Sequence, residues 1–368
     1  MLVFDWFYQA TCSDFTLFLV LQYCWLPGKE YVLIFSFVVF FWETYLNLRQ
    51  HKMLGMKTIP AKVHKAFEPH LLSTDDFEKS RVYSLDKSTY NFFSSAFSQL
   101  ETTLVFTLNF LPWAWGYAGT LRASLGYNAD AEIVQSVIFV GLLTLISTLV
   151  NMPLSLYYTF VIEARHGFNK QTIGLYFSDS IKTLLLTAVI AIVPLERLFF
   201  SGYLRISACV IFDTLLEQAT HNEVLAILAH ELGHWQFSHT TKRLAIIQTH
   251  LFMVFFLFSK VIALDSLYMS FGFDSKPIII GFLLFQFIFT PAESIMGFVM
   301  NLISRHDEFQ ADSYAKKLNY ATDLKNGLIK IHLKNSSNLN PDKLYSIWHY
   351  SHPPLVERLS AIIKSKSE

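Results

Sequence analysis

Apolar residues run through this sequence in long blocks that alternate with shorter polar segments. Residues 31–48, YVLIFSFVVFFWETYLNL, come close to the roughly 20 residues that a helix needs to cross a bilayer, and they end in aromatic residues suited to the membrane interface. Further blocks of comparable character lie at residues 98–118, 134–161, 244–265 and 277–303. The pattern therefore predicts a mainly α fold, a polytopic bundle of membrane helices.

Other segments are too short for membrane spans. Residues 15–27 are apolar but too few to cross a bilayer, so we expect residues 1–30 to form an apolar leader of interfacial type. Residues 183–195 form a second short apolar run. Residues 203–215 are rich in β-forming side chains and predict a single strand.

Basic residues indicate which segments face the cytosol. The segment 49–97 carries eight Lys or Arg against five acids, and the tail 304–368 carries ten basic residues. Because loops rich in Lys and Arg tend to remain cytosolic, we expect both segments there, together with the loop 162–181 and the polar segment before residue 244. If the loop 162–181 and the polar segment before residue 244 both face the cytosol, the chain between them must cross the membrane an even number of times. Only residues 183–195 are available, and one short segment cannot cross the membrane twice.

The composition agrees with a membrane protein. Hydrophobic residues make up 52% of the 368-residue chain and charged residues only 16%, which is too apolar for a typical soluble protein of this length. The net charge is zero, so nucleic acid is not an expected partner. The three cysteines, Cys12, Cys24 and Cys209, are unclustered and predict neither a disulfide framework nor a cysteine metal site.

The polar segment before residue 244 contains a metal-binding pattern. His230 and His234 are four residues apart, so a helix places both imidazoles on one face, where they can ligate one metal ion. Glu231 is predicted to act as general base on a water molecule beside the metal. Asn222 is the expected N-cap of this helix. The alternative is an ordinary buried helix that carries two hydrogen-bonded histidines.

Further candidate residues lie in the C-terminal region. A catalytic zinc site needs a third protein ligand and an open position, and Glu308 is the candidate, with Asp312 one helical turn on as the group that orients a ligating histidine. His349, His352 and Arg358 surround a Pro-Pro turn, where a cationic side chain could stabilise an oxyanion. The alternative for Glu308 and Asp312 is a solvated helix face. The alternative for the residues around the Pro-Pro turn is a capped surface turn. The remaining histidines considered are predicted to be structural or exposed: His239, His250, His306 and His332.

Six segments in this order resemble a known family. They are FVIEARHGFNKQT, IFDTLLE, EVLAILAHELGHW, FQFIFTP, SRHDEFQAD and WHYSHPPLVERL. Together they resemble the type I CaaX prenyl proteases, eukaryotic zinc endopeptidases of the endoplasmic reticulum membrane. The resemblance implies removal of the last three residues from prenylated CaaX proteins, with a second N-terminal cut in some substrates. It also implies seven spanning helices around a large water-filled chamber.

The resemblance assigns roles to single residues. It implies that His230, His234 and Glu308 hold one zinc ion per chain, and that Glu231 is the catalytic glutamate. His352 and Arg358 match a substrate-contacting pair near the active site, and we expect them to act as catalytic residues together with Glu231. The segment that carries His166 and Asn169 also matches the family. We expect Asn169 and His349 to bind substrate. Asp312 is expected to orient a ligating histidine.

The expected organisation follows from these assignments. We expect a leader at residues 1–30 and N-terminal spans with cytosolic loops at residues 31–200. A strand with the metal helix is expected at residues 201–243, followed by C-terminal spans at residues 244–303. A cytosolic region with the third ligand is expected at residues 304–368. The metal site and the C-terminus are expected to face the cytosol from a multi-pass protein of the endoplasmic reticulum membrane. The expected partners are the lipid bilayer and a prenylated CaaX protein or peptide.

The chain departs from the family near residues 194–203. There the family carries another spanning helix, a soluble segment and an Asn-containing stretch that helps to align substrate, and this chain lacks them. The departure coincides with the topological conflict noted above. It leaves open two alternatives to the prenyl protease interpretation, a catalytically impaired membrane protein with a binding role and a protease of broader membrane-protein quality control.

Overall fold

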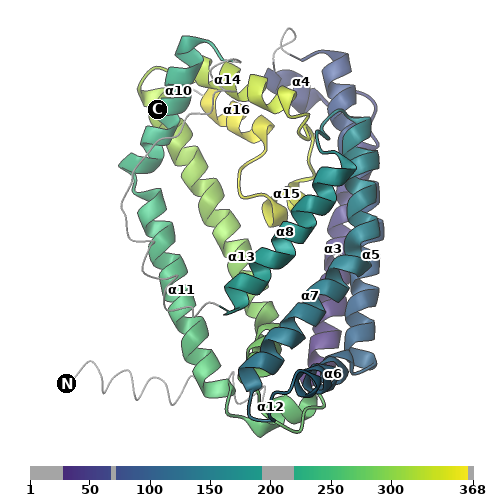
Figure 1. The fold of residues 1–368 in the computed structure, drawn as a ribbon. Coiled ribbons are helices and arrows are strands. Elements are labelled where there is room, and N and C mark those ends of the chain that lie inside the picture. The colour runs from purple at the N-terminus through teal and green to yellow at the C-terminus, as the bar shows by residue number, and fades with distance from the viewer. Residues whose placement is uncertain (1–27, 68–71, 193–218, 364–368) are drawn as a thin grey trace, which may run out of the picture.

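The computed structural model describes residues 28–67, 72–192 and 219–363, and these residues are almost entirely helical (Figure 1). The helices are α3 (Gly28–Leu54), α4 (Ala61–Phe67), α5 (Thr74–Thr107), α6 (Phe110–Ser124), α7 (Glu132–Tyr157), the π-helical η1 (Tyr158–Glu163), α8 (Ile173–Ile192), α10 (His221–Gln236), α11 (His239–Val261), α12 (Asp265–Ser270), α13 (Ile278–Lys317), α14 (Ala321–Lys334), α15 (Lys343–His349) and α16 (Leu355–Ile363). The predicted helical membrane bundle is confirmed. The strand predicted at 203–215 and almost all of the predicted leader lie outside the described residues.

Within the described ranges, helices long and apolar enough to cross a membrane match most of the predicted blocks. They are α3, α7 continued through η1, α11 and α13. These helices contain the apolar blocks at residues 31–48, 134–161, 244–265 and 277–303 nearly in full. The 40-residue helix α13 extends well beyond the apolar block. Its C-terminal turns carry Glu308 and Asp312, which therefore lie on the same helix as the membrane span.

The block predicted as one span at 98–118 is divided between two helices. Helix α5 ends at Thr107, α6 begins at Phe110, and Asn109 between them has a left-handed backbone with φ of 51°. Asparagine adopts this conformation more readily than most residues. The prediction of one continuous helix is therefore wrong here, because hydropathy alone does not register a helix break of this kind.

A proline-containing segment interrupts the other long N-terminal span. Pro153 lies within α7, and the helix widens into the π-helical turns of η1 a few residues later. Both features interrupt regular helical hydrogen bonding. The Tyr90 hydroxyl donates to the Leu154 carbonyl at 3.2 Å, so a side chain from α5 contacts the irregular segment.

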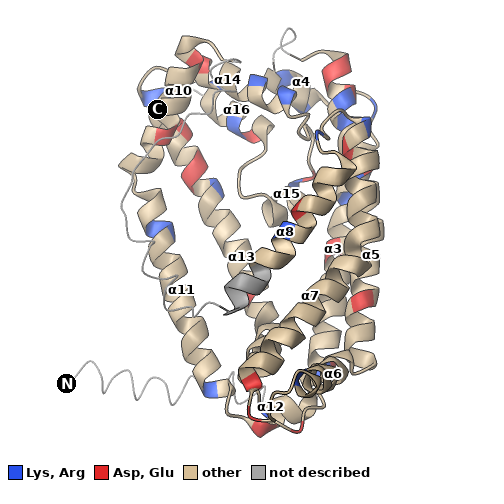
Figure 2. Cartoon of the chain, in the orientation of Figure 1, with Lys and Arg blue, Asp and Glu red and all other residues tan. Residues whose placement is uncertain are grey.

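The long helices run between two ends of the molecule (Figure 1). Helices α6 and α12 lie at one end and α4, α10, α14 and α16 at the other. An apolar core that includes Leu111, Phe139, Tyr268 and Leu284 packs the first end. Figure 2 shows charged residues gathered around the second end, whereas long stretches of α7 and α11 carry none. Helix α10, which carries the two predicted metal ligands, therefore belongs to the charged end.

Candidate active site

Helix α10 begins in a capping box. The Thr220 hydroxyl accepts from the Glu223 backbone N–H at 3.4 Å, and the Glu223 carboxylate accepts from the Thr220 N–H at 2.7 Å. The N-cap is thus Thr220 and the prediction of Asn222 is wrong, although the Thr-x-x-Glu pattern was visible in the sequence. Glu223 also accepts from the Lys330 ammonium at 2.7 Å, which fixes α10 against α14.

A glycine lets α10 approach α13 closely. A Cβ atom added to Gly233 would lie 2.9 Å from the Cα of Ala311, closer than side chains normally come to backbone. Gly233 directly precedes His234, and Ala311 lies one turn from Glu308. The close contact between the two helices therefore brings the paired imidazoles to the carboxylate.

Three predicted ligands converge in the geometry of a metal site. The His230 Nε2 lies 3.1 Å from the His234 Nε2, and the Glu308 carboxylate oxygens lie 3.6 Å from the first and 3.4 Å from the second. Ligand atoms about 2.1 Å from a tetrahedral ion are about 3.4 Å apart. The donor set therefore fits a single divalent metal ion, and Glu308 and His230 are buried while His234 is largely so.

The first imidazole is oriented by a buried carboxylate. The His230 Nδ1 lies 2.9 Å from Oδ1 of Asp312, the residue expected to orient a ligating histidine. Coordination through Nε2 requires the proton on Nδ1, and a carboxylate acceptor favours that tautomer. Arg358 in turn donates to both Asp312 oxygens, at 2.9 and 2.6 Å. The arrangement resembles the carboxylate–histidine pairs that support bound metals.

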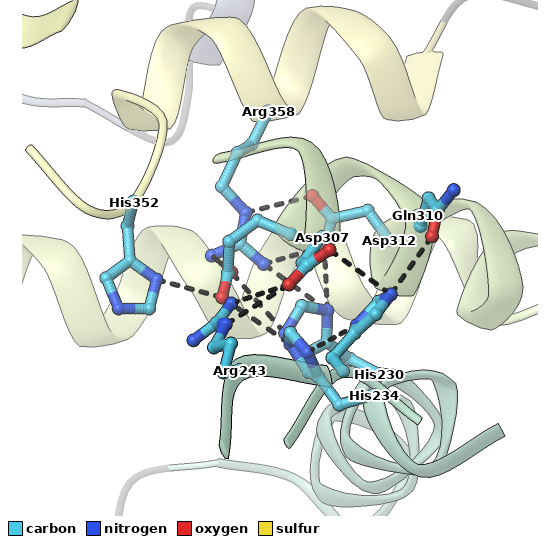
Figure 3. A network of polar contacts seen from close by, with 10 residues as sticks. His230, His234, Arg243, Asp307, Gln310, Asp312, His352 and Arg358 are labelled. Carbon is cyan, nitrogen blue, oxygen red and sulfur yellow. Dashed lines mark hydrogen bonds and ion pairs between the residues drawn. The ribbon is translucent and has the colours of Figure 1, made fainter. Parts of the chain in front are cut away.

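A residue that sequence reasoning missed orients the second imidazole. His239 is buried, and its Nδ1 lies 2.9 Å from the Nδ1 of His234. Its Nε2 lies 3.0 Å from the Gln310 side-chain oxygen and 3.5 Å from Asp307. Figure 3 shows the polar network that includes His234, Gln310 and Asp307. Arg243 holds Asp307 through two contacts of 3.1 Å. Ser238, which has a left-handed backbone conformation, lies between α10, which carries His234, and α11, which begins at His239.

The proposed base differs from the ligands in its surroundings. Glu231 is exposed, and its carboxylate makes no hydrogen bond or ion pair with any of the described residues. It is close enough to Arg358 for its charge to help raise the pKa of the guanidinium. An unengaged carboxylate next to a ligand can accept a proton from solvent.

His352 and Arg358 both contact the third ligand, but in different ways. His352 Nδ1 lies 3.0 Å from Glu308, while two-thirds of its side chain (66%) is exposed. The hydrogen bond and charge of Glu308 raise the pKa of His352. Arg358 is 3.1 Å from Glu308 and buried. Burial lowers the pKa of Arg358, but the hydrogen bond to Asp312 and nearby negative charges raise it by more.

The two predicted substrate-binding residues lie in different cavities. His349 lines the same cavity of about 700 Å³ as His352 and Arg358. Its Nε2 also contacts Glu43 of α3 at 3.0 Å, a residue that the sequence did not single out. Asn169 lines another cavity of about 450 Å³ beside Glu163. The structure therefore does not bring Asn169 to the metal ligands.

The other histidines have separate environments. His250 contacts Glu293 between α11 and α13 at 3.0 Å, and His306 contacts Gln310 at 3.0 Å. The His332 Nε2 lies 3.4 Å from the Asn338 carbonyl. None of these three joins the ligand group, which among the described residues consists of His230, His234 and Glu308.

Comparison with known proteins agrees with the site. The family model described as CAAX prenyl protease N-terminal, five membrane helices, matches residues 50–201, and that of peptidase family M48 matches residues 196–366. CAAX prenyl protease 1 homologues from Oryza sativa subsp. japonica and Mus musculus are 34% and 33% identical, covering 93% and 92% of this chain and 99% and 95% of their own lengths. The crystal structure of S. mikatae Ste24p is similar with a TM-score of 0.75 and 31% identity, covering 92% of this chain and 99% of that chain.

The alignments also bear on the departure from the family. The alignment with the rice relative extends over 425 residues, more than the 368 of this chain. The relative therefore carries residues that this chain lacks, although the expected position near 194–203 falls outside the described residues. The two family models together cover both the membrane helices and the metal-binding region. This chain belongs to peptidase family M48 and, within it, to the CAAX prenyl protease 1 family.

Proposed function

We propose that this protein is a zinc-dependent membrane endopeptidase that removes the C-terminal tripeptide from prenylated CaaX proteins. The observation that carries the proposal is the convergence of His230, His234 and Glu308, with donor atoms 3.1 to 3.6 Å apart. The relatives named CAAX prenyl protease 1 share about a third of their residues with this chain over most of its length, which supports the substrate class.

Zinc is the proposed metal because of the donor set. Two imidazoles and one carboxylate are a common ligand set of catalytic zinc sites in proteases, with the fourth position left for water or substrate. When bound, the ion supplies Lewis acidity, which activates water and polarises a carbonyl oxygen. Asp312 and His239 hold the two imidazoles in the tautomer that leaves each Nε2 free to bind.

The remaining residues divide the other roles. Glu231 takes the proton of the attacking water and transfers it to the leaving amine, which its unengaged and exposed carboxylate permits. We assign to His352, whose side chain is exposed, the donation of a hydrogen bond to the carbonyl oxygen as negative charge develops there. Arg358 is buried against Asp312 and Glu308, so we assign it the positioning of these carboxylates.

We also propose that the protein spans the endoplasmic reticulum membrane with the metal site and the C-terminus in the cytosol. The support is the charge distribution, because the basic segments 49–97 and 304–368 contribute to the end of the bundle that carries α10 (Figure 2). A prenylated substrate would bring its lipid to the bilayer and its peptide to this end.

A cleavage assay tests the proposal. The purified full chain in lipid nanodiscs is incubated with a farnesylated CaaX peptide and with its unprenylated counterpart, each with and without a zinc chelator. We expect release of the tripeptide from the farnesylated peptide, loss of activity with chelator, and recovery on adding zinc. Stoichiometric zinc without cleavage would contradict the proposal and favour a binding role. Equal cleavage of both peptides would favour a protease of broader specificity.

A further inference from the structure

The cavity next to the metal ligands has an unusual charge balance. It has a volume of about 700 Å³ and is lined on one side by α3 and α5 and on the other by α14 and residues 335–358. Lys87, Arg358 and three histidines line it, and no Asp or Glu of the described residues does. A cavity of this size accommodates a small peptide, and its lining favours a negatively charged group.

Lys87 is the cation of this cavity whose charge is not neutralised by a partner. Its ammonium lies 4.9 Å from the centre of the Tyr83 ring, and it forms no ion pair within the described residues. The adjacent Asp86 is engaged by Arg165 at 2.8 Å and by His166 at 2.9 Å. A cation held over an aromatic ring remains available to an anion that enters the cavity.

The other basic residues of the lining are already engaged. Arg358 pairs with Asp312 and Glu308, and His349 contacts Glu43. Burial lowers the pKa of His332, which disfavours the charged form of this side chain. Gln50, which is buried and lines the same wall as Lys87, keeps its side-chain NH₂ group without a hydrogen-bond partner within the described ranges. The lining of the cavity therefore also contains a buried donor without a partner.

We propose that Lys87 binds the C-terminal carboxylate of the peptide substrate, with the cavity holding the tripeptide that is released. The inference rests on the proposed function. An extended tripeptide spans roughly 10 Å. The lining of the cavity includes His352 and Arg358, which contact the metal-ligand candidate Glu308, and also Lys87 on α5. Recognition of a free carboxylate by Lys87 would fix the position of the C-terminal tripeptide relative to the metal ligands.

The test compares two substrates that differ only in the terminal group. The full chain in nanodiscs is given a farnesylated CaaX peptide with a free carboxylate or with a carboxamide. We expect the wild-type kcat/KM for the carboxylate peptide to exceed that for the carboxamide peptide about tenfold or more. A difference of this size is expected when a hydrogen bond between charged groups is lost. This preference should shrink at high ionic strength, because salt screens the attraction.

Variants assign the preference to Lys87. Lys87→Met and Lys87→Gln should lose the preference by weakening cleavage of the carboxylate peptide alone, while Lys87→Arg should keep part of it. Lys260→Met is the matched control, because Lys260 also lies over an aromatic ring, 5.4 Å from the centre of Phe256, but does not line the cavity. Zinc content and melting temperature identify the variants that fold. Only the folded variants are used to test the role of Lys87.

The outcomes separate this inference from the proposed function. Equal cleavage of both peptides by wild type would overturn the assignment of Lys87 and leave the prenyl protease activity intact. A folded Lys87→Met or Lys87→Gln that retains the wild-type preference would also overturn it. A wild-type protein that cleaves neither farnesylated peptide would contradict the proposed function, and this inference with it.

Discussion

The Nδ1 atom of His239 lies 2.9 Å from the Nδ1 atom of His234. If His234 binds a metal through Nε2, its proton resides on Nδ1, and His239 must accept it. The proton of His239 then lies on Nε2, which is 3.0 Å from the Gln310 oxygen. The tautomers of both rings are thus determined by one chain of hydrogen bonds that ends at Gln310 and Asp307.

Replacing His239 should therefore weaken metal binding. We expect His239→Ala to reduce zinc affinity about 10- to 100-fold, because groups that orient metal ligands have effects of this size. His239→Asn should recover part of the loss, since its amide oxygen can accept from His234. Competition with a fluorescent zinc chelator measures the affinity. His306→Ala is the control, because His306 also contacts Gln310 but no ligand; equal loss in both variants would contradict the account.

Asp312 has the corresponding role for the other imidazole. Asp312→Ala removes the acceptor of His230 and leaves Arg358 buried with fewer partners. We expect weaker zinc binding together with a loss of about 1–3 kcal/mol in stability, because buried guanidinium donors lose their acceptor while Glu308 still pairs with the charge. Zinc titration and thermal melting of the detergent-solubilised protein measure the two effects. Unchanged values of both would show that Asp312 does not support the site.

The contact between α10 and α13 depends on Gly233. In Gly233→Ala the new Cβ would meet the backbone of Ala311 at 2.9 Å, so the helices must separate. Overpacking of this kind costs about 1–3 kcal/mol, and the separation should also loosen the metal site. Gly297→Ala on α13 is the control, since nothing lies within 4 Å of its added Cβ. A melting temperature equal to that of the control would contradict the prediction.

The pair between Glu223 and Lys330 should make stability depend on acid pH. Burial raises the pKa of Glu223, but hydrogen bonds from Lys330 and Thr220 lower it by more, so its pKa lies below the ordinary value. Its stabilising contribution is therefore complete above about pH 4.3, the usual glutamate pKa, and is lost as the pH falls through the lowered value. Because Lys330 is about half exposed, we expect no more than about 1 kcal/mol.

Thermal melting between pH 6 and pH 3 measures this contribution. Wild type should lose more stability over this range than Lys330→Met, whose Glu223 has lost its charged partner. The exposed pair of Lys79 with Asp75 on α5 provides the control, and Lys79→Met should leave the pH profile unchanged. Parallel profiles for wild type and Lys330→Met would contradict the role given to this pair.

The sequence predicted features that rest on spacing and length. The four-residue interval between His230 and His234 predicts one helical face, and the carboxylates Glu308 and Asp312 are again one turn apart on α13. The long apolar blocks predict the membrane helices in the same direct way. Each of these inferences needs only local helical geometry.

Features that depend on tertiary contacts could not be predicted in the same way. His239 reaches His234 because Ser238 adopts a left-handed conformation, and no hydrophobic pattern signals that turn. Asn109 divides an apolar block in the same manner. Glu43 lies in an apolar span, and its link to Trp348 and His349 joins segments some 300 positions apart. Such pairings become visible only when the helices are assembled.

Zinc analysis of purified protein tests the central claim, that His230, His234 and Glu308 form one metal site. Wild type should contain one zinc ion per chain, His230→Ala and Glu308→Ala should contain almost none, and Glu231→Gln should retain full zinc while losing cleavage of a farnesylated peptide. Full zinc occupancy in Glu308→Ala, or cleavage by Glu231→Gln at the wild-type rate, would contradict the account.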